Sequence, residues 1–370
     1  MRGVVPYSIR RPLRTGLGWL RWGSQTLLRH SDRGRIRVYY GRDSIPDSSR
    51  VSHGGMVKLQ HLQESFPSSP WNFNLLYMVS SALSRDAAPL LWLLKKRDLR
   101  LVWNQNGVGY LGWHGPRWEK VNEPMARMLH AADHVFYQSR FCKLSADKFL
   151  GKRDGSWQIL YNAVDTRVFT PPALDPDTKH LELLSVGSFQ SFYRFESAVK
   201  TLKRVARHRK DVKLVIAGRL VWDPDHKRTL TAAHRLIDEL GVRDNVTLLP
   251  PYSQKEAPSI FQHANILLHT KYNDPCPTTV IEAMASGLPV VYSASGGVPE
   301  LVGIEAGIGV PGKLNWEKEI PPDAQLMAEA VLKIAERREQ YAEAARQRTV
   351  ERFDIRSWLE AHREVFENVW

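Results

Sequence analysis

The chain has 370 residues, more than a single hydrophobic core usually spans, so we expect two domains. Its formal net charge of +13 favours an anionic partner, and its two cysteines, Cys142 and Cys276, exclude a disulfide framework and indicate a reducing compartment. No run of 18 or more apolar residues is present, so we expect no membrane-spanning helix.

Residues 1–34 form a basic N-terminal segment. Nine arginines lie within the first 37 residues, against Asp32 alone. Between them lie six large apolar residues, namely Leu17, Trp19, Leu20, Trp22, Leu27 and Leu28. Arginine and tryptophan around a short leucine face are typical of a segment that binds an anionic membrane surface, and a disordered basic tail is the alternative. Because Arg21 interrupts the apolar stretch, we expect no cleaved signal peptide.

From Arg35 onward, short apolar runs alternate with amphipathic stretches, which predicts an α/β protein with parallel sheets. In a first domain of residues 35–172, we expect strands at 35–40, 73–79, 100–104 and 133–139, and helices from 56, at 87–97 and at 119–131. In a second domain of residues 173–352, we expect strands at 183–186, 213–217 and 245–249 and a helix from about 196. The proline- and acid-rich residues 171–177 predict the boundary. Residues 353–370 form an amphipathic helix that could cross back to the first domain.

Two glycine-containing loops of the first domain are candidate ligand sites. Gly54 and Gly55 precede a helix, where they let the backbone approach a ligand closely, although such a pair is often only a turn. Residues 104–115 follow a strand, and ligands of open α/β sheets bind at the carboxyl ends of strands. His114 ends this loop, but a lone loop histidine is more often incidental. The basic residues elsewhere match no nucleic-acid-binding motif, so we expect no nucleic-acid partner.

Residues 273–291 carry the most specific pattern. Pro275 and Pro277 cannot lie inside a helix, which predicts that a helix begins at Thr278 or Thr279 and runs past Glu282 to residue 286. The amides at its start suit a diphosphate, and the carboxylates of Asp274 and Glu282, eight residues apart, suit hydroxyls of two sugar rings. An Asx-turn aspartate and a solvated glutamate are the alternative, which the apolar Ala-Met-Ala run after Glu282 disfavours.

Residues 265–302 resemble the donor-binding motif of glycosyltransferase family 4, the retaining GT-B enzymes. That motif has two glutamates separated by seven residues, then Ala-Met-Ala-x-Gly-x-Pro-Val and Gly-Gly-x-Pro-Glu. Here Glu282 matches the second glutamate, residues 283–287 match the helix and residues 296–300 match the loop. Residues 159–172 are similar to the linker signature of the same family. The resemblance implies a GT-B fold of two Rossmann-like domains with the active site in the cleft between them.

The resemblance also implies the roles of individual residues. Glu282 would hold the ribose, Asp274 the donor sugar and Arg194 the diphosphate, with Asn106 or His114 in place of the histidine that family members carry in the first domain. These five are the expected catalytic group. The expected donor-binding group contains Gly54, Gly55, Gly187, Ser188, Gly218, Arg219, Tyr252, Pro277, Thr278, Thr279 and Val280. No cofactor or metal is expected, since amides and arginine would neutralise the phosphates.

Three departures from the family pattern keep other functions open. Asp274 replaces a glutamate, Ser188 stands where an arginine is expected, and Gln105 with Asn106 occupies the place of the histidine. A non-catalytic nucleotide-sugar-binding or assembly protein and a GT-B epimerase are therefore alternatives to the transferase. For the transferase we expect a glycan or lipid-linked acceptor, cell-surface polysaccharide or glycolipid synthesis, and a cytoplasmic location that includes the inner face of the membrane.

Overall fold

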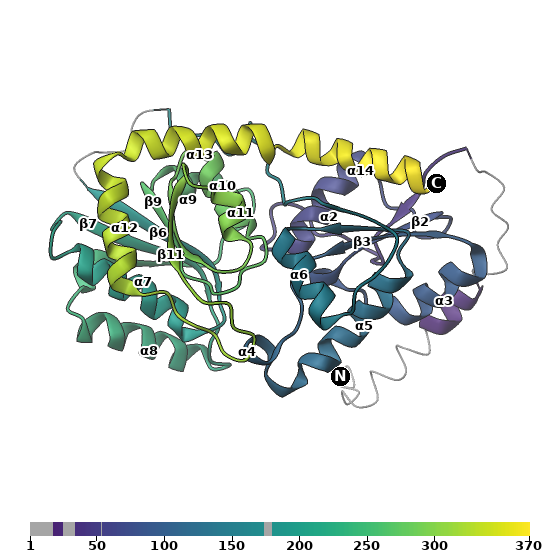
Figure 1. The fold of residues 1–370 in the computed structure, drawn as a ribbon, viewed down its shortest axis with the longest axis horizontal. Coiled ribbons are helices and arrows are strands. Elements are labelled where there is room, and N and C mark those ends of the chain that lie inside the picture. Colours follow the sequence, from purple (N-terminus) through teal and green to yellow (C-terminus); the bar gives the residue numbers. More distant parts are fainter. Residues whose placement is uncertain (1–17, 25–33, 53, 174–179) are drawn as a thin grey trace, which may run out of the picture.

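The computed structural model describes residues 18–24, 34–52, 54–173 and 180–370. In it the chain forms two α/β lobes that lie side by side, each built on a parallel sheet (Figure 1). The first lobe contains strands β1 to β5 and the second contains β6 to β11. Most of the predicted basic segment, with Leu17, Leu27 and Leu28, and residues 174–177 of the predicted linker lie outside the described residues.

The sheet of the first lobe has the order β1-β2-β3-β4-β5, and all its pairs are parallel. Its strands are β1 (Val38–Tyr39), β2 (Leu75–Val79), β3 (Arg100–Gln105), β4 (His134–Tyr137) and β5 (Ser156–Ile159). Side chains of β2 alternate between two apolar layers, with Leu76 and Met78 in one and Leu75, Tyr77 and Val79 in the other. Both faces of the sheet are therefore buried, as expected of parallel sheets.

Helices cover both faces of this sheet. They are α2 (Gly54–Ser65), α3 (Ala87–Arg97), α4 (Leu111–His114), α5 (Trp118–Ala131) and α6 (Arg140–Phe149), with 3₁₀ turns η2 (Ser80–Ala82) and η3 (Gly115–Arg117). Residues of α3, α5 and α6 share one apolar layer, and α2 lies in the other. The helices predicted at 87–97 and 119–131 are thus present, with α5 beginning one residue earlier.

The sheet of the second lobe has the order β11-β10-β9-β6-β7-β8 and is also parallel. Its strands are β6 (Leu181–Phe189), β7 (Val212–Leu220), β8 (Val246–Leu249), β9 (Ile266–His269), β10 (Val290–Ala294) and β11 (Gly307–Pro311). The order reverses between β6 and β9, so the loops after these strands diverge and leave a crevice at their carboxyl ends.

Two layers of helices enclose the second sheet as well. They are α7 (Phe192–Val205), α8 (His226–Glu239), η4 (Arg243–Asn245), α9 (Ala257–Gln262), α10 (Thr278–Ala285), α11 (Val298–Val302), α12 (Ala324–Glu336) and α13 (Arg338–Arg352). One face packs against α7, α8 and α12, and the other packs against α9, α10 and α11. The predicted start of α10 at Thr278 is confirmed, and its end lies one residue before the predicted one.

The predicted ends of β6 and β7 were wrong, and so was the start of α7. Both strands continue to residues 189 and 220, and α7 begins at Phe192 rather than near residue 196. The extension exists because the two strands pair with each other through Gly187 and Gly218, beyond the apolar stretches that marked them in the sequence. Gly218 has φ +129°, and a Cβ there would lie 2.2 Å from the carbonyl oxygen of Gly187.

The chain crosses between the lobes twice, and the two crossings touch each other. The amide of Val164 donates to the carbonyl of Phe353 (3.0 Å), and the amide of Ile355 donates to the carbonyl of Val164 (2.9 Å). Helix α14 (Ile355–Val369) then packs its Trp358 and Phe366 in the apolar layer that α2 shares with the first sheet. In Figure 1, α13 and α14 run end to end across both lobes.

The described part of the N-terminal segment is helical over residues 18–24. Trp22, expected on a membrane-facing surface, is instead buried in the first lobe, where its Nε1 donates to Asp86 at 3.1 Å. Trp19 and Leu20 remain exposed. Within the described ranges, no helix is long and apolar enough to cross a membrane.

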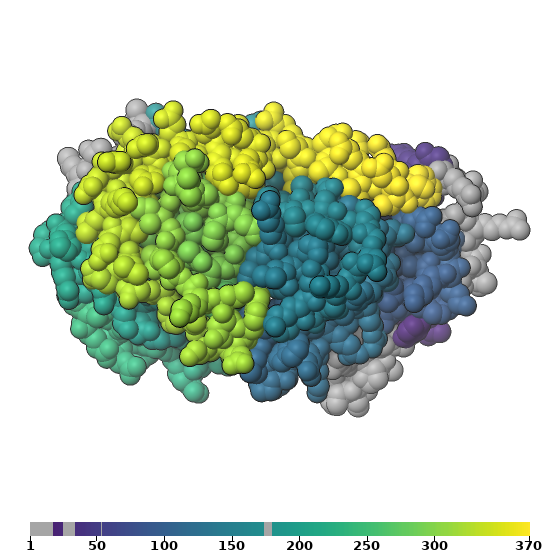
Figure 2. All heavy atoms as spheres, in the orientation of Figure 1, coloured from purple at the N-terminus to yellow at the C-terminus, as the bar shows by residue number. Residues whose placement is uncertain are grey.

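The lobes are in close contact beside the crossings, as the space-filling view shows (Figure 2). The carboxylate of Glu300 in the second lobe accepts from the amides of Arg140 (2.9 Å) and Phe141 (3.0 Å), and so caps α6 of the first lobe. The hydroxyl of Ser139 donates to the carbonyl of Pro275 (2.7 Å). Both free cysteines, Cys142 of α6 and Cys276 of the second lobe, are buried.

Candidate active site

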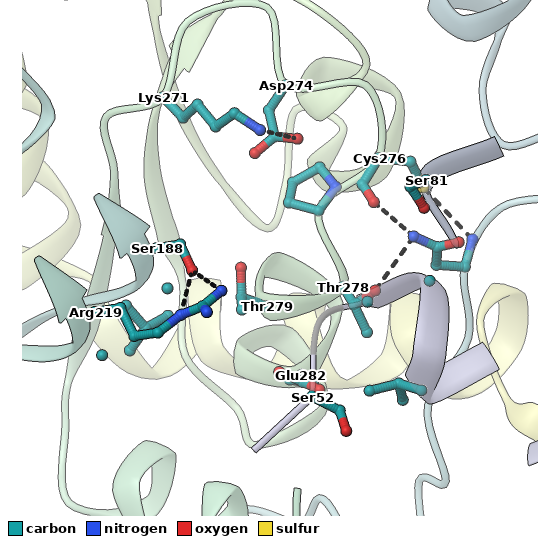
Figure 3. A pocket seen from close by; sticks show the side chains of 18 of the residues that line it. Ser52, Ser81, Ser188, Arg219, Lys271, Asp274, Cys276, Thr278, Thr279 and Glu282 are labelled. Carbon is teal, nitrogen blue, oxygen red and sulfur yellow. Dashed lines mark hydrogen bonds and ion pairs between the residues drawn. The ribbon is translucent and has the colours of Figure 1, made fainter. Parts of the chain in front are cut away.

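A cavity of about 440 Å³ lies between the two lobes. The second lobe contributes the ends of β6, β7 and β9 and the start of α10, while the first lobe contributes the start of α2. The cavity therefore opens where the strand order of the second sheet reverses. In the close view of Figure 3, Asp274 and Glu282 lie toward opposite ends of it, with Thr278 and Thr279 between them.

The N-termini of α2 and α10 lie next to each other at the cavity. A Cβ on Gly54 of α2 would lie 3.5 Å from Oγ1 of Thr278, which begins α10. No side chain caps α10 at Pro277, and Asn162 of the crossing holds the Thr278 hydroxyl through Nδ2 at 3.2 Å. Neighbouring N-terminal amides and helix dipoles create an anion site. Val280 differs from expectation, since its amide donates to the carbonyl of Pro277 (3.2 Å) and its buried side chain lies in the core.

Arginines from two elements lie on the second-lobe side of the cavity. Ser188, found where the family pattern has an arginine, accepts from Nε (3.2 Å) and Nη2 (2.9 Å) of Arg219 on the neighbouring strand. Figure 3 shows this pair. Arg194 is buried, donates to the carbonyl of Ser188 and lies over the Phe189 ring at 4.8 Å. The extension of β7 thus brings the guanidinium of Arg219 to Ser188, where the family pattern has an arginine and this sequence does not.

Lys58 supplies a cation from the first lobe. It lies one turn into α2, is buried and lines the cavity. Burial lowers the pKa of its ammonium to about 8. Four cationic side chains and two carboxylates line the cavity in all, namely Lys58, Arg194, Arg219 and Lys271 with Asp274 and Glu282. This excess of positive charge around the helix N-termini favours a polyanionic ligand.

Asp274 is held by two neighbours in the second lobe. Its carboxylate lies 3.3 Å from Nζ of Lys271 and 3.2 Å from Nε2 of His269, and it is buried. Burial alone would raise its pKa, but attraction by Lys271 and the hydrogen bond from His269 hold the pKa well below its ordinary value. Asp274 is therefore an ionised acceptor at the cavity wall.

Glu282 is a buried carboxylate that accepts a hydrogen bond from Nε2 of Gln254 at 2.8 Å. Burial raises its pKa to about 7, and the hydrogen bond from Gln254 only partly offsets this. Tyr252 and Ser253 line the same end of the cavity. A buried carboxylate with spare acceptor capacity can take hydrogen bonds from a pair of ligand hydroxyls.

Most of the predicted site residues come together in this cavity. Those that line it are Asp274, Glu282, Arg194, Asn106, Gly54, Gly55, Gly187, Ser188, Gly218, Arg219, Tyr252, Pro277, Thr278 and Thr279. His114 lies apart, in a smaller neighbouring cavity, and burial and Lys271 lower its pKa. Gln105 is in the core, where its Oε1 accepts from the Trp103 indole at 2.7 Å.

Sequence reasoning missed several polar residues of the cavity, and four of them carry or contact its charged groups. Lys58, Gln254, His269 and Lys271 all line it. Only Lys58 carries a signal in the sequence, because it interrupts the apolar residues of a helix that follows two glycines. Gln254 comes from the loop after β8, and no pattern connects it with Glu282. In the described part of the chain, no cluster of three or more His, Cys, Asp or Glu side chains could hold a metal ion.

Residues 169–348 match the family model of the glycosyl transferases group 1. The chain is also similar to D-inositol 3-phosphate glycosyltransferase of Mycolicibacterium smegmatis, with 31% identity over 183 residues. That match covers 47% of this chain and 39% of the relative, so the chain matches about two fifths of the relative's length.

Solved structures share the fold over most of the chain. Sucrose-phosphate synthase from Thermosynechococcus elongatus has a TM-score of 0.67 at 19% identity, covering 81% of this chain and 74% of that one. Anabaena HepE, solved in complex with UDP-glucose, has a TM-score of 0.65 at 16% identity. The match covers 80% of this chain and 79% of that one. The two lobes with their parallel sheets therefore form a GT-B fold.

Proposed function

Because residues 169–348 belong to the group 1 glycosyl transferases and the described chain has the GT-B fold, we propose that the protein is a glycosyltransferase. It moves a sugar from a nucleoside diphosphate donor to a hydroxyl of a glycan or lipid-linked acceptor. The observation that carries the proposal is the cavity in which two helix N-termini lie next to each other between Asp274 and Glu282.

The order of groups along the cavity matches the order of groups in such a donor. Hydroxyls of the ribose donate to Glu282, beside Tyr252. The diphosphate lies at the amides of Thr278 and Thr279, beside Gly54 and Gly55. Arg194, Arg219 and Lys58 neutralise it. Hydroxyls of the transferred sugar bind Asp274 at the other end.

We infer retention of anomeric configuration from the resemblance of residues 265–302 to retaining enzymes. The bond from the anomeric carbon to the diphosphate breaks, a bond to the acceptor oxygen forms, and the acceptor's proton passes to the departing diphosphate. Asn106, which lines the cavity near Asp274, has an amide side chain that is not basic enough to take this proton. The protein's contribution is therefore to position the reactants and stabilise the charge on the leaving group. No cofactor is needed for these steps.

The first test is thermal unfolding with UDP, GDP, ADP and their sugar conjugates. Ligand at about 100 times its dissociation constant adds roughly 2.7 kcal/mol of stability. We expect a shift with one base and none in the Glu282→Ala variant, which leaves the ribose hydroxyls unmatched. Equal shifts in the variant and the wild-type protein would contradict the assignment of Glu282.

A non-catalytic nucleotide-sugar-binding or assembly protein is the other candidate. The observation that favours it is the amide of Asn106 at the cavity, where the family carries a histidine. Release of nucleotide during incubation with the donor and an acceptor extract separates the two functions. Sustained release supports the transferase, and binding without release supports the alternative.

We propose further that the enzyme works in cell-surface polysaccharide or glycolipid synthesis, in the cytoplasm at the inner face of the membrane. The basic segment supports this, together with Trp19 and Leu20, whose side chains are 42% and 72% exposed. Flotation with anionic liposomes tests it. The truncated variant must begin after residue 17, because removal of Trp22 would open the core of the first lobe. Equal flotation by the truncated Trp19→Ser/Leu20→Ser protein would refute membrane binding through this segment.

A further inference from the structure

A second cavity, of about 230 Å³, opens beside the donor cavity. Asn106, Lys271 and Pro275 line both, so the two cavities meet at the Asp274 end, where the transferred sugar is placed by the proposed function. A group bound in the second cavity would therefore lie next to the anomeric carbon. The dimensions suit one sugar ring rather than a chain.

Aromatic side chains from both lobes form the wall of the second cavity. Trp316 comes from the second lobe, and its ring centroid lies 5.1 Å from that of Tyr110 and 5.4 Å from that of Phe141. Its carbonyl accepts from the amide of Gly112 at 2.9 Å, which fixes the loop against α4. Trp113 of α4 adds a further ring. Faces of aromatic rings pack well against the C–H groups of a pyranose.

Apart from Lys271 and His114, the polar side chains at this cavity are neutral amides and hydroxyls. Asn273 is buried, and its Nδ2 donates to the carbonyl of Asn315 at 3.1 Å. Asn106 adds a second amide at the junction of the two cavities.

No uncompensated charge faces the second cavity. Lys271, its one ammonium, lies 3.3 Å from the carboxylate of Asp274 and 5.2 Å from the Trp113 ring centroid. Its lining contains no aspartate or glutamate. The pKa of His114 is lowered by burial and by Lys271, which keeps the imidazole neutral at pH 7. A phosphorylated or carboxylated sugar would find no free cation here.

We propose that the second cavity is the acceptor subsite and that it takes an uncharged sugar ring, which stacks on the aromatic wall. This inference rests on the proposed function, because it places the acceptor hydroxyl beside the donor. The acceptor is thus the neutral terminal sugar of a glycan or glycoside rather than a phosphorylated sugar.

Saturation-transfer NMR with the full chain tests the proposal. The probes are methyl glucoside, galactoside, mannoside and N-acetylglucosaminide, with glucose 6-phosphate and glucuronate as charged counterparts, each in the presence of the nucleotide that stabilises the protein. We expect at least one neutral glycoside to bind and the charged sugars to bind at least about tenfold more weakly, or about 1.4 kcal/mol. Binding of a charged sugar as tight as that of every neutral one would overturn the proposal.

Substitutions at the second cavity test whether the glycoside binds there. Val121 of α5 is 38% exposed at this cavity, and Val121→Trp should fill it, whereas Val350→Trp on α13, with 41% exposure, is the matched control. Trp113→Ala should raise the glycoside Kd about tenfold, and Trp113→Phe should restore part of the loss. Nucleotide Kd should stay within about twofold in all four variants. Unchanged glycoside binding in Val121→Trp and Trp113→Ala would place the acceptor elsewhere.

The two proposals fail in different ways. If no nucleotide shifts the unfolding temperature, the proposed function itself is wrong. If a nucleotide binds but no neutral monosaccharide glycoside does, the donor site stands and the acceptor inference is overturned.

Discussion

Glu282 lies in the candidate active site, where burial makes its ionised form unfavourable. Its pKa is raised by burial from an ordinary value of 4.5 to about 7, so the folded state binds a proton more readily than the unfolded state between these values. Linkage then requires the stability of the protein to fall as pH rises from about 4.5 to about 7 and to stay reduced above that. The site keeps this carboxylate at a cost in stability, as functional sites often do.

We predict that Glu282→Gln stabilises the protein at pH 8 and weakens nucleotide binding. The neutral amide keeps the acceptor for Gln254 but removes the buried charge, so the free energy of unfolding should rise by on the order of 1 to 3 kcal/mol. Urea unfolding at pH 5 and pH 8 measures this, and the gain should shrink at pH 5. Glu343→Gln, an exposed change on α13, is the control. A variant less stable than wild type at pH 8 would contradict this account of Glu282.

Lys58 offers a second test at the level of one residue. Lys58→Met should weaken binding of a nucleoside diphosphate about tenfold, or about 1.4 kcal/mol, and leave binding of the nucleoside unchanged. The reason is that the proposed position of the donor brings its phosphates, and not its nucleoside, to Lys58. Calorimetric titration of both ligands measures the difference, with the exposed Lys333→Met as control. An equal loss for nucleoside and diphosphate would mean that Lys58 shapes the lobe instead.

Asp274 should affect both stability and transfer. Asp274→Asn leaves Lys271 and His269 without a buried counter-charge, which typically costs about 3 to 5 kcal/mol. Below its melting transition the variant should still bind nucleotide but transfer sugar slowly. Denaturant unfolding and nucleotide titration measure the two effects, at about 15 °C because the variant is expected to be marginally stable. Loss of nucleotide binding in the folded variant would show that Asp274 supports the whole cavity.

At the scale of elements, the site depends on where strands and helices end. The sequence motif located Asp274, Thr278 and Glu282 because they lie within nine residues around one helix start. Arg219 was predicted from the end of its strand, but its hydrogen bonds to Ser188 were not, because the strand pairing that creates them is a tertiary contact. Long, strongly periodic helices such as α3 were predicted with correct ends. The ends of β6 and β7 were not, since the two strands continue to pair beyond the point where their apolar residues end.

A substitution at the strand extension tests its importance. Gly218→Ala places a methyl group 2.2 Å from the carbonyl of Gly187 at a φ of +129°, so β6 and β7 must separate. We expect a loss of about 2 to 4 kcal/mol and weaker diphosphate binding, as Arg219 moves from Ser188. Gly23→Ala, where a Cβ meets nothing within 4 Å, is the control. Stability equal to that of the control in a melting experiment would contradict the strain.

At the scale of the molecule, the site is complete only while the lobes are together. The sequence predicted two α/β units from their local patterns, and its resemblance to glycosyltransferase family 4 implied a cleft between them. It could not predict the contacts between lobes, such as the capping of α6 by Glu300 or the insertion of Trp316, since these join residues far apart in the chain. Because the two crossings are hydrogen-bonded to each other near Val164, we expect the lobes to separate about a single hinge.

The two buried cysteines make it possible to measure how fast the lobes separate about this hinge. Cys142 and Cys276 are the only thiols in the chain, one on each lobe, and burial raises the pKa of Cys142 to about 12 and that of Cys276 further still. Only a thiolate reacts rapidly with a disulfide reagent, so labelling must await an opening event. The labelling rate of the native protein would therefore report how often the lobes separate. It should slow with bound nucleotide and quicken in Glu300→Ala.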